Sequence, residues 1–180
     1  SRSLYGSGSL DNQGTLNINL SSNAQTLAVS ARLNNTGSID VQQGILDSQT
    51  TTFTNSGLIR VAEDARMQTE RSLQNDINGT LTGEGLFLTG SNYAVVNAGT
   101  LNPGDGVGEL NIGGDLLMQS SSIFNIELGS ASVFDLLTVT GDSTLNGVLT
   151  VDLVDAYQPL IGQTFDILLT ETLYGQFTSV

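Results

Sequence analysis

The stretch LNNTGSIDV at residues 33–41 is followed by FTNSGLIRV at residues 53–61. Both carry an apolar residue, then Asn-x-Gly, then two apolar residues in alternation. With the glycine as marker, the pattern recurs at Gly14, Gly37, Gly57, Gly79 and Gly99, with gaps of 23, 20, 22 and 20 residues. A period of about 20 to 50 residues predicts a fold of stacked structural repeats.

The residues around each marker glycine suggest a turn followed by a strand. Apolar residues lie two positions after the glycines, and we expect them to stack in one inward-facing column: Leu16, Ile39, Ile59, Leu81 and Leu101. Four of the glycines follow an Asn by two positions: Asn12, Asn35, Asn55 and Asn97. The repeat at Gly79 departs from the pattern. The two residues before this glycine are Ile77 and Asn78, and Asn75 occupies the position four before it, where the other repeats have an apolar residue. Asn tolerates the left-handed region and Gly enters it without penalty, so Asn-x-Gly predicts a turn.

Each repeat also holds a second apolar run. These runs lie at residues 27–29, 45–46, 65–67 and 86–88. One repeat then reads as strand, turn and second strand, which cannot bury its apolar face alone but can do so by stacking. The chain is therefore predicted to be an all-β, single-domain parallel β-solenoid of about 20 residues per coil, with about four coils between residues 10 and 101. Residues 1–100 are the repeating coils, and residues 101–180 are a C-terminal solenoid or cap region continuous with them.

Two segments leave the secondary structure open to more than one interpretation. Residues 62–73 (AEDARMQTERSL) fit a helix, but we favour a strand in which Ala65 and Met67 point inward. From Leu101 onward the strands are richer in continuous Leu, Val and Ile, which predicts burial on both faces.

The charges are distributed unevenly. Residues 1–71 carry six acids and all five basic residues, which are Arg, whereas residues 72–180 carry twelve acids and no base. A nucleic-acid interface is excluded because phosphate neutralisation needs Lys and Arg. The acids predict a solvated surface. Divalent-cation binding is the alternative, with Asp152 and Asp155 as an example of a carboxylate pair that calcium could use, although no calcium-loop motif is present.

Catalytic chemistry has few candidate residues. The chain has no His, Lys or Cys, which removes the common general base, the Schiff-base nucleophile, the catalytic triad and thiolate metal sites. A carboxylate pair acting on a sugar remains. Such an enzyme would need aromatic stacking from Phe or from Tyr5, Tyr93, Tyr157 or Tyr174. The run Thr50-Thr51-Thr52 reads as outward-facing residues rather than nucleophiles. We therefore expect that the protein is not an enzyme, and that it has no catalytic site, no metal site and no cofactor.

The second half resembles a known group of surface proteins. The matching pieces are residues 101–104 (LNPG), 108–115 (GELNIGGD), 134–141 (FDLLTVTG), 145–151 (LNGVLTV), 162–168 (GQTFDIL) and 175–177 (GQF). Over residues 95–177 they resemble the C-terminal passenger region of bacterial autotransporter adhesins and related surface β-helix proteins, including some with a PEP-CTERM sorting tail. The resemblance implies a right-handed parallel β-helix that is exported, extracellular and non-catalytic, with a C-terminal segment that seeds or caps folding.

These observations predict a function without catalysis. No stretch is apolar enough to span a membrane and no signal peptide opens the chain, so we expect Ser1 to begin a processed mature protein or a fragment. The favoured hypothesis is a structural subunit that self-associates head to tail into a bacterial surface or biofilm-matrix filament. One alternative is a fragment of an autotransporter-type adhesin passenger that binds a host or surface ligand, such as a glycan or protein. The other is a carbohydrate-acting, tailspike-like enzyme.

Overall fold

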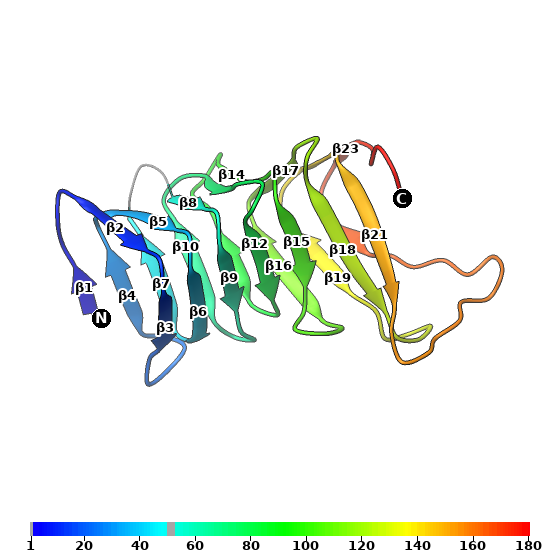
Figure 1. Ribbon diagram of the computed structural model, residues 1–180, viewed down its shortest axis with the longest axis horizontal. Coiled ribbons are helices and arrows are strands. Elements are labelled where there is room, and N and C mark those ends of the chain that lie inside the picture. The colour runs from blue at the N-terminus through cyan, green and yellow to red at the C-terminus, as the bar shows by residue number, and fades with distance from the viewer. Residues whose placement is uncertain (1, 50–52) are drawn as a thin grey trace.

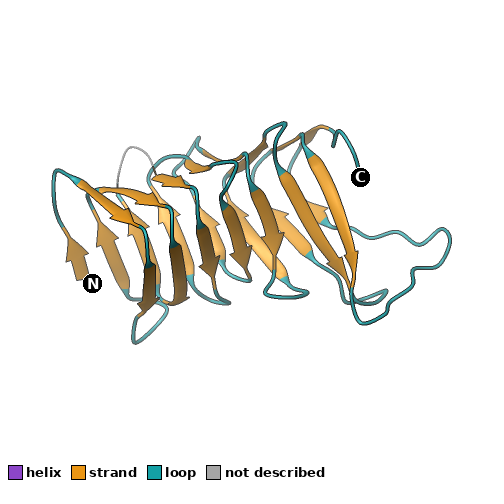
Figure 2. Ribbon diagram, in the orientation of Figure 1, coloured by secondary structure: helices purple, strands orange, loops and turns teal. Residues whose placement is uncertain are grey.

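The chain forms one elongated stack of coils, with its termini at opposite ends (Figure 1). The computed structural model describes residues 2–49 and 53–180. Among these residues there is no helix, and the strands form three parallel sheets (Figure 2). Each complete coil contributes one strand to each sheet, and the last, partial coil contributes β22 and β23 to two of them. The predicted all-β parallel solenoid is therefore confirmed.

The three sheets are named by the order in which the chain enters them. Sheet A holds β1 (Arg2–Leu4), β4 (Thr26–Val29), β7 (Ile45–Ser48), β10 (Arg66–Thr69), β13 (Leu86–Leu88), β16 (Glu109–Gly113), β19 (Leu136–Val139) and β22 (Leu168–Leu169). Sheet B holds β2 (Ser9–Asn12), β5 (Arg32–Asn35), β8 (Phe53–Asn55), β11 (Leu73–Asn75), β14 (Ala94–Asn97), β17 (Asp115–Met118), β20 (Ser143–Leu145) and β23 (Leu173–Gly175). Sheet C holds β3 (Thr15–Asn19), β6 (Ser38–Gln43), β9 (Leu58–Val61), β12 (Thr80–Gly83), β15 (Thr100–Pro103), β18 (Ile123–Leu128) and β21 (Val148–Leu153).

The predicted apolar column is confirmed in sheet C. Its register neighbours are, in order, Leu16, Ile39, Ile59, Leu81, Leu101, Phe124 and Leu149. Their spacings of 23, 20, 22, 20, 23 and 25 residues give coils slightly longer than expected toward the C-terminus. The members from Ile39 to Phe124 are fully buried, whereas Leu16 and Leu149 are half-buried near the ends of the stack.

The strand count per repeat was predicted wrongly. The runs at 27–29, 45–46, 65–67 and 86–88 do form sheet A, and Ala65 and Met67 are buried, so residues 62–73 contain strands rather than a helix. However, the residues before each Asn-x-Gly form a third strand, in sheet B. These sheet B strands are only three or four residues long, too short to show a period in the sequence.

The repeated asparagines form a buried ladder rather than left-handed turns. Each Nδ2 donates to the Oδ1 of the next, at 2.7, 2.7, 2.7 and 2.6 Å along Asn12, Asn35, Asn55, Asn75 and Asn97. The ladder ends where Met118 is the register neighbour of Asn97. None of these asparagines has a positive φ. The assignment at Gly79 was therefore wrong: two extra residues separate this glycine from Asn75, which takes the ladder position.

Close backbone approach requires glycine at four of the five marker positions, and Gly14 in the first coil is the exception. A Cβ on Gly37 would lie 2.1 Å from the carbonyl oxygen of Gly14, and one on Gly57 would lie 2.1 Å from that of Gly37. Neither they nor the other marker glycines have a positive φ. The expected left-handed conformation is found instead at other glycines, such as Gly44 and Gly83.

The C-terminal half alternates like the rest of the stack. Strand β18 reads exposed, buried, half-buried, buried along its length, and Leu117 and Ile123 point outward. Burial on both faces was thus a wrong prediction, because each solenoid sheet has a core face and an outer face. Beyond β21, residues 154–167 form a long loop that packs aromatic rings at its base: Phe165 lies 5.2 Å from Phe134 and 6.3 Å from Tyr157, centroid to centroid.

Candidate functional site

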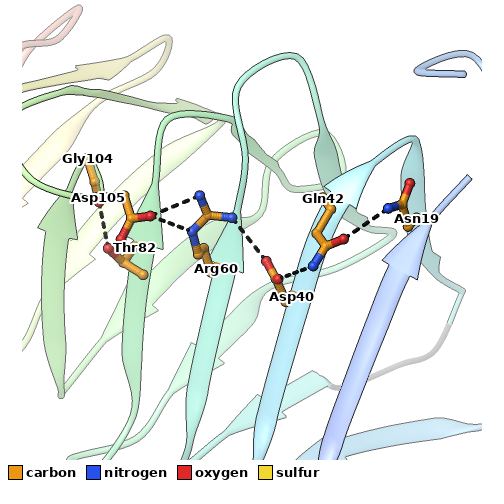
Figure 3. Close-up of polar contacts among 7 residues, drawn as sticks. All are labelled: Asn19, Asp40, Gln42, Arg60, Thr82, Gly104 and Asp105. Carbon is orange, nitrogen blue, oxygen red and sulfur yellow. Dashed lines mark hydrogen bonds and ion pairs between the residues drawn. The ribbon is translucent and has the colours of Figure 1, made fainter.

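The outer face of sheet C carries a polar network centred on Arg60 (Figure 3). Its Nη1 donates to Asp40 Oδ1 at 3.1 Å, and its Nε and Nη2 contact Asp105 Oδ2 at 3.1 and 3.0 Å. Gln42 donates to Asp40 at 2.7 Å and accepts from Asn19 at 3.0 Å. Asp105 lies in the loop after β15, so the guanidinium joins residues from separate coils.

The charges of this network are satisfied internally. Burial works to lower the pKa of Arg60, but hydrogen bonds and attraction from Asp40 and Asp105 outweigh it and raise that pKa. Asp105 is largely exposed, and exposed ion pairs contribute only about 0–1 kcal/mol each. The network therefore orders the outer face and the Asp105 loop, and it leaves no free cation here for an anionic ligand.

A groove of about 940 Å³ lies over the outer face of sheet A, here called the sheet A groove. Its floor is a column of register neighbours: Ile45, Arg66, Leu86 and Asn111. Its wall is formed where the chain passes from sheet C to sheet A, and includes Asn23, Ala24, Glu63, Asp64 and Glu84. The groove is thus polar and acidic at its rim, with aliphatic side chains on its floor.

One polar atom in the groove has no partner. Arg66 Nε is buried from solvent and, within the part of the chain that the structure describes, donates to no acceptor. A buried unpaired donor costs about 1–3 kcal/mol. The sequence did contain a signal for this surface, since Ile45 and Leu86 sit next to inward-facing Leu46 and Phe87 and must therefore point outward.

Among the residues that the structure describes, Asp135 is the one acid whose pKa is strongly shifted. It is fully buried in the hairpin that follows β18, and its two carboxylate oxygens accept from the backbone N–H groups of Gly108 and Glu127, each at 2.8 Å. Burial raises the pKa of Asp135 to about 6, although the two N–H donors act to lower it. Its role is to tie the hairpin to the neighbouring coil rather than to face a ligand.

The carboxylate pair suggested for calcium is arranged differently from the expectation. Asp152 lies on β21, where its register neighbour is Glu127, and Asp155 follows that strand with a φ of 52°. Among the residues described, no three His, Cys, Asp or Glu side chains are grouped so that they could hold a metal ion. The carboxylates of Glu127 and Asp152 therefore form an acidic pair on adjacent coils without a third ligand of this kind.

The tyrosines considered for sugar stacking do not share a platform. Tyr5 is exposed near the N-terminal end of the stack, whereas Tyr157 and Tyr174 lie near the other end. Tyr93 lies between them and contacts Arg71, whose Nη1 donates to its hydroxyl at 2.6 Å. The run Thr50–Thr52 lies outside the described residues.

The two end coils are the remaining candidate surfaces. At the N-terminal end Leu4 and Tyr5 are exposed, and at the C-terminal end so are Leu169, Leu173 and Tyr174. Strands β1, β2 and β3 at one end and β22 and β23 at the other each pair with only one neighbour among the described residues.

Comparisons with known proteins identify no relative of this chain. No protein-family model, curated protein or solved structure matches the chain. The described residues include no helix of the length and hydropathy needed to cross a membrane. Function must accordingly be argued from the geometry of the surfaces above.

Proposed function

We propose that the protein is a non-catalytic, extracellular structural subunit that stacks head to tail into a bacterial surface or biofilm-matrix filament. The observation that carries this proposal is the pair of matching sheet edges at the two ends of the stack. The chain enters sheets A, B and C in that order through β1, β2 and β3, and the last complete strands in these sheets are β22, β23 and β21. The two ends therefore present edges of the same three sheets, all with parallel strands.

Sheet edges of this kind favour addition of another chain. Unpaired N–H and C=O groups along an edge strand form a ready template for pairing. In sheet C, the C-terminal tail covers the first part of β21: Ser179 bridges Val148 and accepts from the Leu149 N–H at 3.0 Å, and Phe177 stacks on Phe124. The second part of β21 stays free of the tail, with Val151 and Leu153 exposed. A heterologous contact between unlike ends does not close on itself and so generates a filament.

Apolar and charged groups at the ends support the same arrangement. Head-to-tail contact would remove Leu4, Leu173 and Tyr174 from water, and buried apolar area contributes about 25 cal/mol per Å². Arg2 and Arg32 are exposed in the first coils, and Glu171 is exposed just before β23. Opposite charges at the two ends favour one polarity and faster encounter, while each exposed pair adds little stability.

The adhesin-passenger hypothesis is supported by the same edges. In a longer chain, further coils would continue the three sheets, as the resemblance of residues 95–177 to autotransporter passengers suggests. The outer faces of the sheets would then carry the ligand site.

Size in solution separates these hypotheses. Electron microscopy and sedimentation of the purified chain, with and without millimolar calcium, should show filaments or ladders for the structural subunit. Deleting residues 1–9, which removes β1 from the N-terminal edge, should abolish them. A monomer at high concentration in both buffers, or unchanged assembly after the deletion, would contradict head-to-tail stacking and favour the passenger fragment.

A further inference from the structure

The loop at residues 154–167, here called the C-terminal arm, is a braced structure with an apolar tip. Phe165 packs at its base against Phe134 and Tyr157. Gln163 Oε1 accepts from the Tyr157 hydroxyl at 2.8 Å and from the Leu160 N–H at 3.0 Å, and the Gln163 N–H donates to the Leu160 carbonyl at 3.0 Å. This turn holds Leu160 and Ile161 at exposed fractions of 79% and 108%.

The arm extends along the long axis of the stack, past the last strands β21 and β22 (Figure 1). It connects sheet C to sheet A, so it lies at the same corner of the coil as the wall of the sheet A groove. In a head-to-tail stack the arm would therefore run beside the first coils of the next subunit, at the corner between its β3 and β4, which is where Asn23 and Ala24 begin the groove.

The length of the arm suits this position. The seven residues from Val154 to Leu160 span at most about 20 Å when extended, which corresponds to about four strand spacings of about 4.8 Å. In sheet A, Ile45 of the next subunit would lie three strands beyond β22, after that subunit's β1 and β4. Ile45 lies within this upper limit, but the arm reaches it only if the turn at its base, where the Tyr157 N–H donates to the Val154 carbonyl at 2.9 Å, opens.

We propose that the C-terminal arm of one subunit docks in the sheet A groove of the next and locks the stack. This inference rests on the proposed head-to-tail function and names the contact that stabilises it. The occupant of the groove is a second copy of this chain, because the groove begins at the first coils and the arm projects from the last coil.

The chemistry of the two surfaces is compatible. Residues 156–165 (AYQPLIGQTF) carry no charge, so the tip meets the acidic rim without like-charge repulsion. Leu160 and Ile161 would cover the aliphatic floor at Ile45.

Cross-linking tests the contact directly, because the chain has no cysteine of its own. A protein carrying Leu160→Cys and Ala24→Cys is treated with a flexible bismaleimide and separated on a denaturing gel. Ala24 lies between β3 and β4, and Leu160 follows β21; these strands lie toward opposite ends of one subunit (Figure 1), so a link between the two positions joins two chains. We expect a ladder of linked species. The matched control combines Leu160→Cys with Ser9→Cys, an exposed position on sheet B, and should give none.

A second variant measures the contribution of the tip. Leu160→Ser with Ile161→Ser alters only exposed side chains, so the melting temperature of the subunit should not change. The concentration for half-maximal assembly should rise by at least about tenfold, because two aliphatic side chains no longer enter the groove. If the unmodified chain assembles but the Ala24 pair gives no ladder, or the tip variant assembles at the same concentration, arm docking is wrong and stacking stands. If the unmodified chain stays monomeric, both proposals are overturned.

Discussion

Replacing Asn55 by Ala should cost about 3–4 kcal/mol of unfolding free energy. Asn55 is fully buried; it accepts from Asn35 and donates to Asn75 Oδ1, each at 2.7 Å. The two lost ladder hydrogen bonds account for about 1–3 kcal/mol, and leaving Asn75 Oδ1 buried without its donor adds about 1–3 kcal/mol. The longer contacts of the Asn55 amide with Gly57 and Thr80 are lost as well. The loss should appear in urea unfolding followed by far-ultraviolet circular dichroism, as a lower midpoint at unchanged slope.

Two control variants make this result specific to the ladder. Asn12 ends the ladder and is half-buried, so water can replace its partner and Asn12→Ala should cost only about 1 kcal/mol. Thr54→Ala changes an outward neighbour on the same strand and should cost about 0.5 kcal/mol or less. If Asn55→Ala and Asn12→Ala both lowered the unfolding free energy by the same small amount, the ladder argument would be wrong. The asparagines would then act as turn formers, as the sequence suggested.

Three further variants address the core, the close backbone contacts and the buried acid. Gly57→Ala places a Cβ against a backbone carbonyl oxygen and should destabilise the fold by more than about 3 kcal/mol. Gly14→Ala, where a Cβ would have no atom within 4 Å, should leave the stability nearly unchanged. Thermal melting compares the two variants, and equal melting temperatures would contradict the argument that a side chain does not fit at Gly57. Ile39→Asp buries an unpaired carboxylate at a cost of several kcal/mol and should prevent folding; an unchanged melting curve would mean that the site is wet. Asp135 has a pKa of about 6 in the folded state against 3.8 ordinarily, so its contribution to stability is fully present below pH 3.8 and is lost as pH rises through 6. That amounts to about 3 kcal/mol at 1.36 kcal/mol per unit. Between pH 4 and pH 7 the unaltered chain should lose about 3 kcal/mol more unfolding free energy than Asp135→Asn does. Parallel profiles of unfolding free energy against pH for the two proteins would contradict the raised pKa of Asp135.

The period and the inward column could be predicted because they depend on local alternation. Ile39 and Ile59 each follow a marker glycine by two residues, and the strand pleat alone places them inward. The position of Asn75 could not be predicted in the same way, because two extra residues move the glycine and leave the ladder in place. Only the hydrogen bonds between neighbouring coils identify which Asn belongs to the ladder.

The surfaces were less accessible to sequence reasoning. Arg60 contacts Asp105 across 45 residues, and no periodic pattern predicts that the loop after β15 folds back over an earlier coil. The sheet A groove depends on corner loops of unequal length, so that its depth is a property of the assembled stack. The arm was visible in the sequence only as a stretch without a clear strand period, and its direction along the axis required the fold.

The parallel stacking of coils has a mechanical consequence. The hydrogen bonds between coils point along the long axis and the chain termini lie at opposite ends (Figure 1), so a pulling force applied to the termini loads these bonds one coil at a time. Peeling a coil of about 22 residues would release about 75 Å of chain at about 3.4 Å per residue. Under tension such a molecule would unfold in steps of similar length rather than in a single event. After each coil is released, the next coil becomes the end of the stack and its hydrogen bonds carry the force.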